Sequence, residues 1–203
     1  TNMIYREGAP DKLIISGYDQ YFYLSHFLNW GKDKLEILPS LRYKHSKKII
    51  NSNMVYLPYV IFNINKVLIL FEKLISNNNL RLKYYFDQKN HPLCTDSPIH
   101  KKLILGIEEI YKKYEIDKSM KSKNTSIFIG PTSAVIESLV RGENVYHICS
   151  DPVFEAYSSR VWPNIIVEEI EDDIFHYKIL EKNKTIILGN DDKLFDNDYI
   201  SEY

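Results

Sequence analysis

Short apolar runs alternate along the chain with longer segments in which apolar positions recur every three or four residues. The short runs predict strands at 12–16, 35–41, 54–59, 80–86, 126–129 and 144–149. The longer segments predict helices at 18–30, 65–75, 98–114 and 132–140, with Gly31 and Gly142 just past the ends of the first and the last. Strands that alternate with helices at this spacing predict βαβ crossovers. We therefore expect an α/β fold: a doubly wound, mostly parallel, Rossmann-like sheet with helices on both faces.

A break in this pattern divides the chain. Residues 42–48 (RYKHSKK) are basic and show no hydrophobic periodicity, which favours a linker. We expect residues 1–48 to be the last β-α-β unit of an N-terminal domain followed by this linker. Residues 49–203 would form a second domain with an acidic surface tail at 190–203. Because the chain begins at Thr1 rather than at Met, we expect it to be a fragment of a longer protein.

Composition and charge exclude several classes of protein. The chain has 44% hydrophobic and 26% charged residues, as expected for a globular rather than a disordered protein. A net charge of −1 provides no basic field that would recruit nucleic acid. The longest apolar stretch, 67–71, is too short for a transmembrane segment. Cys94 and Cys149 are far apart, and no His or Cys residues have metal-ligand spacing, so we expect neither a disulfide framework nor a metal site.

The turn after the fifth expected strand is the first candidate for chemistry. Gly130-Pro131 ends the strand, and Thr132 and Ser133 open the next helix. One interpretation is a helix cap, in which a hydroxyl accepts a hydrogen bond from a backbone N–H. The other is a phosphate site, in which the first N–H groups of the helix, its dipole and both hydroxyls bind an anion. Glu137 is then either a solvated carboxylate or a group that binds the two hydroxyls of a ribose.

The loop after the fourth expected strand is the second candidate. It contains Lys89-Asn90-His91-Pro92, and in a parallel sheet it lies at the same carboxyl edge as the turn described above. His91 is either an ordinary loop residue or a hydrogen-bond donor to a phosphate, with Pro92 stiffening the backbone beside it. Glu7 and Asp19 are either surface carboxylates or general bases.

These motifs, taken in order, resemble the C-terminal, donor-binding half of a GT-B glycosyltransferase. The resemblance covers roughly residues 50–160 and rests on KNHP, a helix, GPTSAVIESLVRG and then NVYHI. It is closest to bacterial sialyltransferases and related capsule or surface-glycan transferases. In that group an HP motif and a pair of hydroxyl residues hold the phosphate of a CMP-linked donor, and in many GT-B enzymes a glutamate contacts the donor's ribose. The resemblance implies a donor nucleotide site formed by His91, Pro92, Gly130, Thr132, Ser133 and Glu137.

The resemblance also implies an inverting sugar transfer that needs neither a cofactor nor a metal. The partners would be a nucleotide-sugar, CMP-linked by preference, and a glycan acceptor, in the cytoplasm or in peripheral association with the inner face of the membrane. The acidic motif that supplies the general base in those sialyltransferases has only Arg6-Glu7-Gly8 as a counterpart. The base is therefore expected outside this chain. Two alternatives stay open: a polyol-phosphate transferase of cell-wall polymer synthesis with a CDP-linked donor, and a nucleotide-binding module without catalysis.

Overall fold

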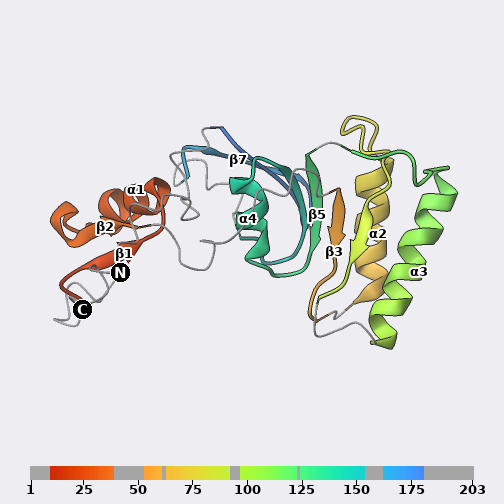
Figure 1. Ribbon diagram of the computed structural model, residues 1–203, viewed down its shortest axis with the longest axis horizontal. Coiled ribbons are helices and arrows are strands. Elements are labelled where there is room, and N and C mark those ends of the chain that lie inside the picture. Colours follow the sequence, from red (N-terminus) through yellow and green to blue (C-terminus); the bar gives the residue numbers. More distant parts are fainter. Residues whose placement is uncertain are drawn as a thin grey trace. The chain divides into compact units, whose positions relative to one another are not determined.

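The computed structural model describes residues 10–38, 53–60, 63–91, 97–122, 124–153 and 162–180 (Figure 1). The expected linker at 42–48, the acidic tail at 190–203, Glu7, Pro92 and Cys94 lie outside these residues. The described chain divides into two compact units. The first contains residues 10–38, 162–166 and 179–180, and the second contains the remaining described residues. The chain thus returns to the first unit near its end, a return that the expected division into 1–48 and 49–203 did not include.

The first unit is built on a short parallel β-α-β arrangement. It comprises β1 (Leu13–Ile15), α1 (Tyr18–Phe27), the 3₁₀ turn η2 (Lys32–Lys34) and β2 (Leu35–Ile37), with Leu13 opposite Leu35. Ile15, Trp30 and Leu35 form its buried core.

The first helix is shorter than expected. It ends at Phe27 because Asn29 adopts a left-handed conformation, with φ of 56°. Gly31 has a φ of −58° and precedes η2, so the prediction that Gly31 closes the helix is wrong.

A six-stranded mixed sheet lies mainly in the second unit. Its strands are β3 (Met54–Tyr56), β4 (Asp87–Lys89), β5 (Thr125–Ile129), β6 (Asn144–Ile148), β7 (Ile165–Glu171) and β8 (Ile174–Ile179), in the order β4-β3-β5-β6-β8-β7. β4, β3, β5 and β6 are parallel, whereas β8 is antiparallel to β6. The expected α/β fold with a largely parallel sheet is confirmed. The last two strands were not predicted.

Helices cover both faces of this sheet. α2 (Ile64–Ser76) and α3 (Pro98–Lys113) lie on one side of β3 and β5, and α4 (Ala134–Val140) lies on the other (Figure 1). The core between the sheet and α2 and α3 includes Phe71 and Ile107, each completely buried, together with Ile127 of β5. The Asn63 side chain caps α2 by accepting a hydrogen bond of 3.0 Å from the Lys66 N–H. Because the helix after β3 and the helix after β5 pack on opposite faces, a crevice is expected between these two strand ends.

The fourth strand lies later in the chain than expected. The prediction of a strand at 80–86 is wrong, because pairing with β3 begins only at Asp87. The preceding apolar residues, Leu82, Tyr85 and Phe86, are buried in the core without joining the ladder. The Asn53 side chain instead donates a 2.8 Å hydrogen bond to the Tyr85 carbonyl. This shift places β4 directly before His91.

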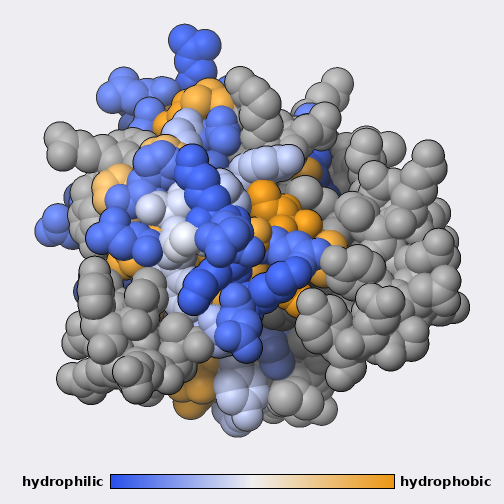
Figure 2. Space-filling view, turned by 90° about the vertical axis from the view of Figure 1, so that its left-hand side faces the viewer, coloured by the Kyte–Doolittle hydropathy of each residue, from blue (hydrophilic) through white to orange (hydrophobic). Residues whose placement is uncertain are grey.

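In the part of the chain that the structure describes, no helix is long and apolar enough to cross a membrane. Among the residues coloured in Figure 2, most of the surface is polar, with smaller hydrophobic areas between the polar side chains.

Candidate functional site

Two turns touch at the carboxyl edge of the parallel strands. Pro58 follows β3 and Gly130 follows β5. Gly130 has a φ of 77°, and a Cβ atom added there would lie 2.8 Å from Cβ of Pro58. A larger residue would therefore meet both backbone strain and a steric overlap, which explains the glycine at this position.

Two buried histidines hold these turns through their carbonyl groups. Nε2 of His100, on α3, lies 2.6 Å from the Pro58 oxygen, and Nε2 of His147, on β6, lies 2.8 Å from the Gly130 oxygen. A carbonyl can only accept, so each Nε2 carries the proton. Burial lowers the pKa of His147, although the bond to Gly130 opposes this shift. His147 is therefore neutral at pH 7 and donates a single fixed bond to the turn.

The start of α4 differs from the expected one. The helix begins at Ala134, and Ser133 occupies the N-cap position with a helical backbone and no side-chain capping bond. Thr132 Oγ1 accepts a 3.2 Å hydrogen bond from the Ala134 N–H. The capping interpretation therefore applies to Thr132. Since α4 has only seven residues, we assign no anion site to its dipole alone.

The far end of α4 closes as expected. Gly142, with φ of 86°, donates to the Leu139 carbonyl at 2.8 Å, and Glu143 donates to the Ser138 carbonyl at 3.1 Å. These are the two bonds of a Schellman motif. The motif fixes the direction in which the chain leaves Arg141.

A cavity of about 380 Å³, here called the α4 cavity, lies between α4 and the ends of β3 and β4. It brings together His91, Thr132 and Glu137, which the sequence placed in two separate motifs. Its polar lining residues are Tyr56, Tyr59, Lys89, Asn90, His91, Thr132, Glu137, Ser138 and Arg141. His91 thus lies beside the turn that follows β5, as expected for two strand ends at one carboxyl edge.

The end of this cavity next to β4 offers hydrogen-bond donors on an aromatic floor. The Tyr56 ring stacks on Phe128 with centroids 4.4 Å apart, and Nζ of Lys89 lies 5.4 Å from the centroid of Tyr56. The His91 ring lies 5.0 Å from the ring of Tyr59. Burial raises the pKa of the Tyr56 phenol most, with a further contribution from Glu143. The phenol is therefore neutral at pH 7, and together with Lys89 and His91 it can donate to an anion.

The α4 side of the cavity contains an ion pair. An oxygen of Glu137, Oε1, binds Nη2 of Arg141 one turn later in the helix. The Glu137 side chain is 29% exposed, whereas that of Arg141 is only 11% exposed. The carboxylate is thus the more accessible partner and the guanidinium the more buried one.

The other predicted site residues lie elsewhere. Ser133 is exposed and does not line the α4 cavity, although its neighbour Thr132 does. Gly130 shapes the turn beside the cavity. Asp19 belongs to the first unit, is 1% exposed and accepts a 2.9 Å hydrogen bond from the Asn164 side chain. Because Asp19 is buried, its carboxylate is not placed to contact a glycan acceptor directly. Glu7 and Pro92 lie outside the described residues.

Sequence reasoning missed three lining residues with strong chemistry: Tyr56, Lys89 and Arg141. Lys89 could have been predicted as a site residue, since it precedes His91 by two positions at the same strand end. Arg141 follows Glu137 at the i, i+4 spacing that joins side chains on a helix. Tyr56 had no comparable signal, because its orientation depends on the register of β3.

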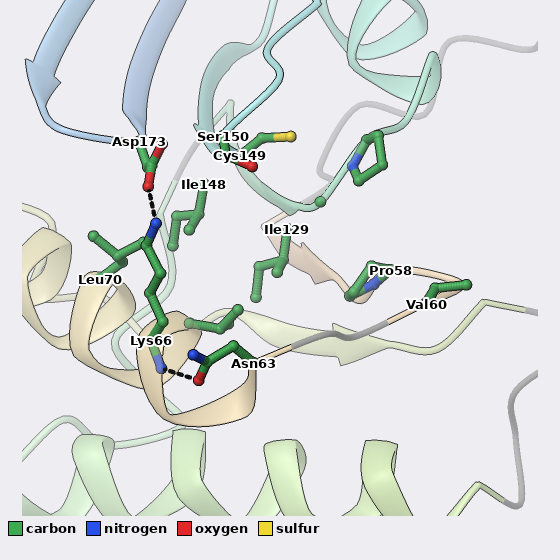
Figure 3. A pocket seen from close by; sticks show the side chains of 13 residues that line it. Pro58, Val60, Asn63, Lys66, Leu70, Ile129, Ile148, Cys149, Ser150 and Asp173 are labelled. Carbon is green, nitrogen blue, oxygen red and sulfur yellow. Dashed lines mark hydrogen bonds and ion pairs between the residues drawn. The ribbon is translucent and has the colours of Figure 1, made fainter.

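A second, smaller cavity of about 170 Å³, here called the α2 cavity, lies on the other side of the two turns. Figure 3 shows Leu70, Ile129 and Ile148 around it, with Lys66 reaching to Asp173. Pro58 and Pro131 line both cavities. The α2 cavity is thus mainly apolar, with one ion pair at its border.

Within the described ranges, no three His, Cys, Asp or Glu side chains are grouped so that they could hold a metal ion. Comparison of the chain with protein-family models, with curated proteins and with solved structures gave no match.

Proposed function

We propose that this chain is the donor-binding half of an inverting glycosyltransferase that uses a nucleotide-sugar. The proposed reaction transfers a sialic-acid-like sugar from a CMP-linked donor to a bacterial surface or capsular glycan. One observation carries the proposal: His91 and Thr132, from motifs on different strands, line the same cavity at the carboxyl edge of a parallel sheet. Ligands of doubly wound sheets bind in such crevices.

The lining of the α4 cavity suits a ligand that carries both an anion and hydroxyl groups. Lys89 and His91, at the end of β4, and the hydroxyl of Thr132, just before α4, can donate to phosphate oxygens. Glu137, on the α4 side, can accept hydrogen bonds from a sugar. A ribonucleoside monophosphate has both features.

In the proposed reaction a hydroxyl oxygen of the acceptor forms a bond to the anomeric carbon as the bond from that carbon to the phosphate oxygen breaks. The nucleotide leaves with the electron pair, and donors around its phosphate stabilise the developing charge. A base accepts the acceptor's proton, and we leave that base unassigned. Such an enzyme would work in the cytoplasm or at the inner face of the membrane, where nucleotide-sugars are supplied.

Calorimetry with CMP, CDP, UDP and GDP tests the proposal. We expect CMP to bind, and His91→Ala and Thr132→Ala each to weaken CMP binding by about tenfold or more, because each loses a hydrogen bond to a charged group. His26→Ala, an exposed histidine of α1, and Ser76→Ala, at the end of α2, are matched controls that should leave affinity unchanged.

Thr132→Ala also removes the capping bond to Ala134, so Thr132→Ser, which keeps the hydroxyl, separates capping from ligand binding. If none of the four nucleotides binds, or if His91→Ala binds CMP as tightly as the wild type does, the proposal is wrong. Analysis of the product distinguishes the two transferases, because a phosphodiester bond in the product indicates transfer of a polyol phosphate.

A further inference from the structure

The ion pair between Glu137 and Arg141 differs from the lysine ion pairs among the described residues. In the pairs of Lys66, Lys73, Lys113 and Lys121 with acidic residues, the cation is 42–64% exposed. Such pairs contribute little to stability. In contrast, the Arg141 side chain is only 11% exposed and borders a cavity. A buried cation beside an accessible carboxylate is not an ordinary pair on the surface of a helix.

The hydrogen bonds of Arg141 are also incomplete. Its Nη2 binds Glu137, but its Nε is buried and has no hydrogen-bond partner among the described residues. A buried donor without a partner is costly, and native proteins keep such groups for a reason. The Arg141 N–H also donates to the Glu137 backbone carbonyl at 3.2 Å, which is the ordinary i to i+4 bond of a helix. It is therefore the side chain of Arg141 that acts on the Glu137 carboxylate.

The side-chain bond to Nη2 occupies Oε1 of the Glu137 carboxylate and leaves Oε2 available. Oε2 of Glu137 has no hydrogen-bond partner within the part of the chain that the structure describes, and the side chain lines the α4 cavity. A carboxylate with one oxygen fixed cannot rotate freely. Its second oxygen then points in a reproducible direction and can accept hydrogen bonds from ribose hydroxyls at a set position.

We propose that Arg141 is a positioning residue that orients Glu137 to select ligands with a vicinal diol, as in a ribose. This inference rests on the proposed nucleotide site and names the group that selects the sugar of the nucleotide. The planar guanidinium fixes an orientation that a flexible ammonium group would not.

The test is the ratio of the affinities for CMP and 2′-deoxy-CMP, measured by calorimetry on the full chain. We expect the wild type to prefer CMP by about tenfold or more, since the 2′-hydroxyl donates to a charged carboxylate. Glu137→Gln and Arg141→Gln should each reduce this ratio to nearly one. The double variant should show no further loss, because effects that pass through one group do not add. Arg141→Lys should restore part of the preference.

Arg81→Gln, an exposed arginine after α2, is the matched control and should keep the wild-type ratio. A purely structural role for Arg141 predicts that Arg141→Gln weakens CMP and 2′-deoxy-CMP equally; an unchanged ratio therefore overturns the inference. Should Arg141→Gln fail to fold, Arg141→Lys still decides, since a ratio identical to that of the wild type would show that the guanidinium fork is irrelevant.

The inference and the proposed function fail in different ways. If the wild type binds CMP and 2′-deoxy-CMP equally, the inference is wrong and the nucleotide site stands. If the wild type binds neither, both are wrong.

Discussion

The α4 cavity and the α2 cavity share Pro58 and Pro131, yet their linings have opposite character. Consecutive residues of β5 show the cause. Phe128 lines the first cavity and Ile129 lines the second, because successive side chains of a strand point to opposite faces. The same sheet edge therefore borders two different environments.

The helices increase this difference. α2 has thirteen residues and packs against the long helix α3, so the α2 cavity borders the main hydrophobic core. α4 is short and packs mainly on β6, and the ends of β3 and β4 beside it present Tyr56 and Lys89 to the α4 cavity. Helix length, as well as strand alternation, therefore determines which face of a sheet edge is available to a polar ligand.

Ile129→Ala should give the largest effect on stability and little effect on binding. Ile129 is 1% exposed, and truncation of such a residue leaves a cavity that costs about 2–5 kcal/mol. Denaturant unfolding measures the loss, and CMP affinity should change less than twofold. Ile69→Ala, on the exposed side of α2, is the control and should cost no more than about 0.5 kcal/mol. A strong loss of CMP binding in a still-folded Ile129→Ala would mean that the α2 cavity takes part in the site.

Gly130→Ala should give the next largest effect and should affect both cavities. The left-handed backbone costs an L-residue about 1–2 kcal/mol. The new Cβ must also displace Pro58, which borders both cavities, so CMP binding should weaken as well. Gly142→Ala carries a similar backbone cost at φ of 86°, so the excess destabilisation of Gly130→Ala measures the contact with Pro58. Equal losses in the two variants would show that this contact is unimportant.

The fold was predictable where the pattern was strong, as at α3 and at the Schellman end of α4. The prediction was wrong where tertiary packing determined whether a segment forms a strand. The apolar segment 80–86 enters the core without pairing, and no local pattern distinguishes that from a strand. β7 and β8 were missed although their sequence carried a signal. Two apolar runs flank Asp172-Asp173, and Asp173 has the left-handed backbone, with φ of 65°, that suits a hairpin turn.

The candidate site was predictable only at the level of strand ends. The rule that ligands bind at the carboxyl edge correctly placed His91 near the Gly130 turn. It could not choose between Thr132 and Ser133, because that choice depends on the residue at which α4 begins. Nor could it show that Arg141 is mostly buried, since burial depends on the packing of α4 and its surroundings.

The smallest expected effect is a pH dependence of stability that arises from His147, beside the Gly130 turn. His147 on β6 is completely buried and donates to the Gly130 carbonyl, and burial lowers its pKa below the usual value. The unfolded chain therefore binds a proton more readily than the folded protein does. The contribution of neutral His147 to the free energy of unfolding is fully present above the pKa of about 6.5 in the unfolded chain. It is lost as the pH falls through the lower pKa of the folded protein, by at most about 1.4 kcal/mol per pH unit for one proton. Melting temperatures between pH 7 and 5 measure this loss.

His147→Gln keeps an N–H that can reach the Gly130 carbonyl but cannot titrate. Because glutamine packs less well in this site, the variant should be less stable than the wild type at pH 7. Because glutamine does not titrate, the melting temperature of the variant should change less with pH. His26→Gln, at an exposed position on α1, should keep the wild-type slope. Because the Tyr177 hydroxyl lies 3.4 Å from Nδ1 of His147, Tyr177→Phe removes the neighbouring donor and should leave the pH slope in place. If His147→Gln and the wild type lose stability in parallel, the pH dependence comes from other groups and the turn does not depend on a neutral His147.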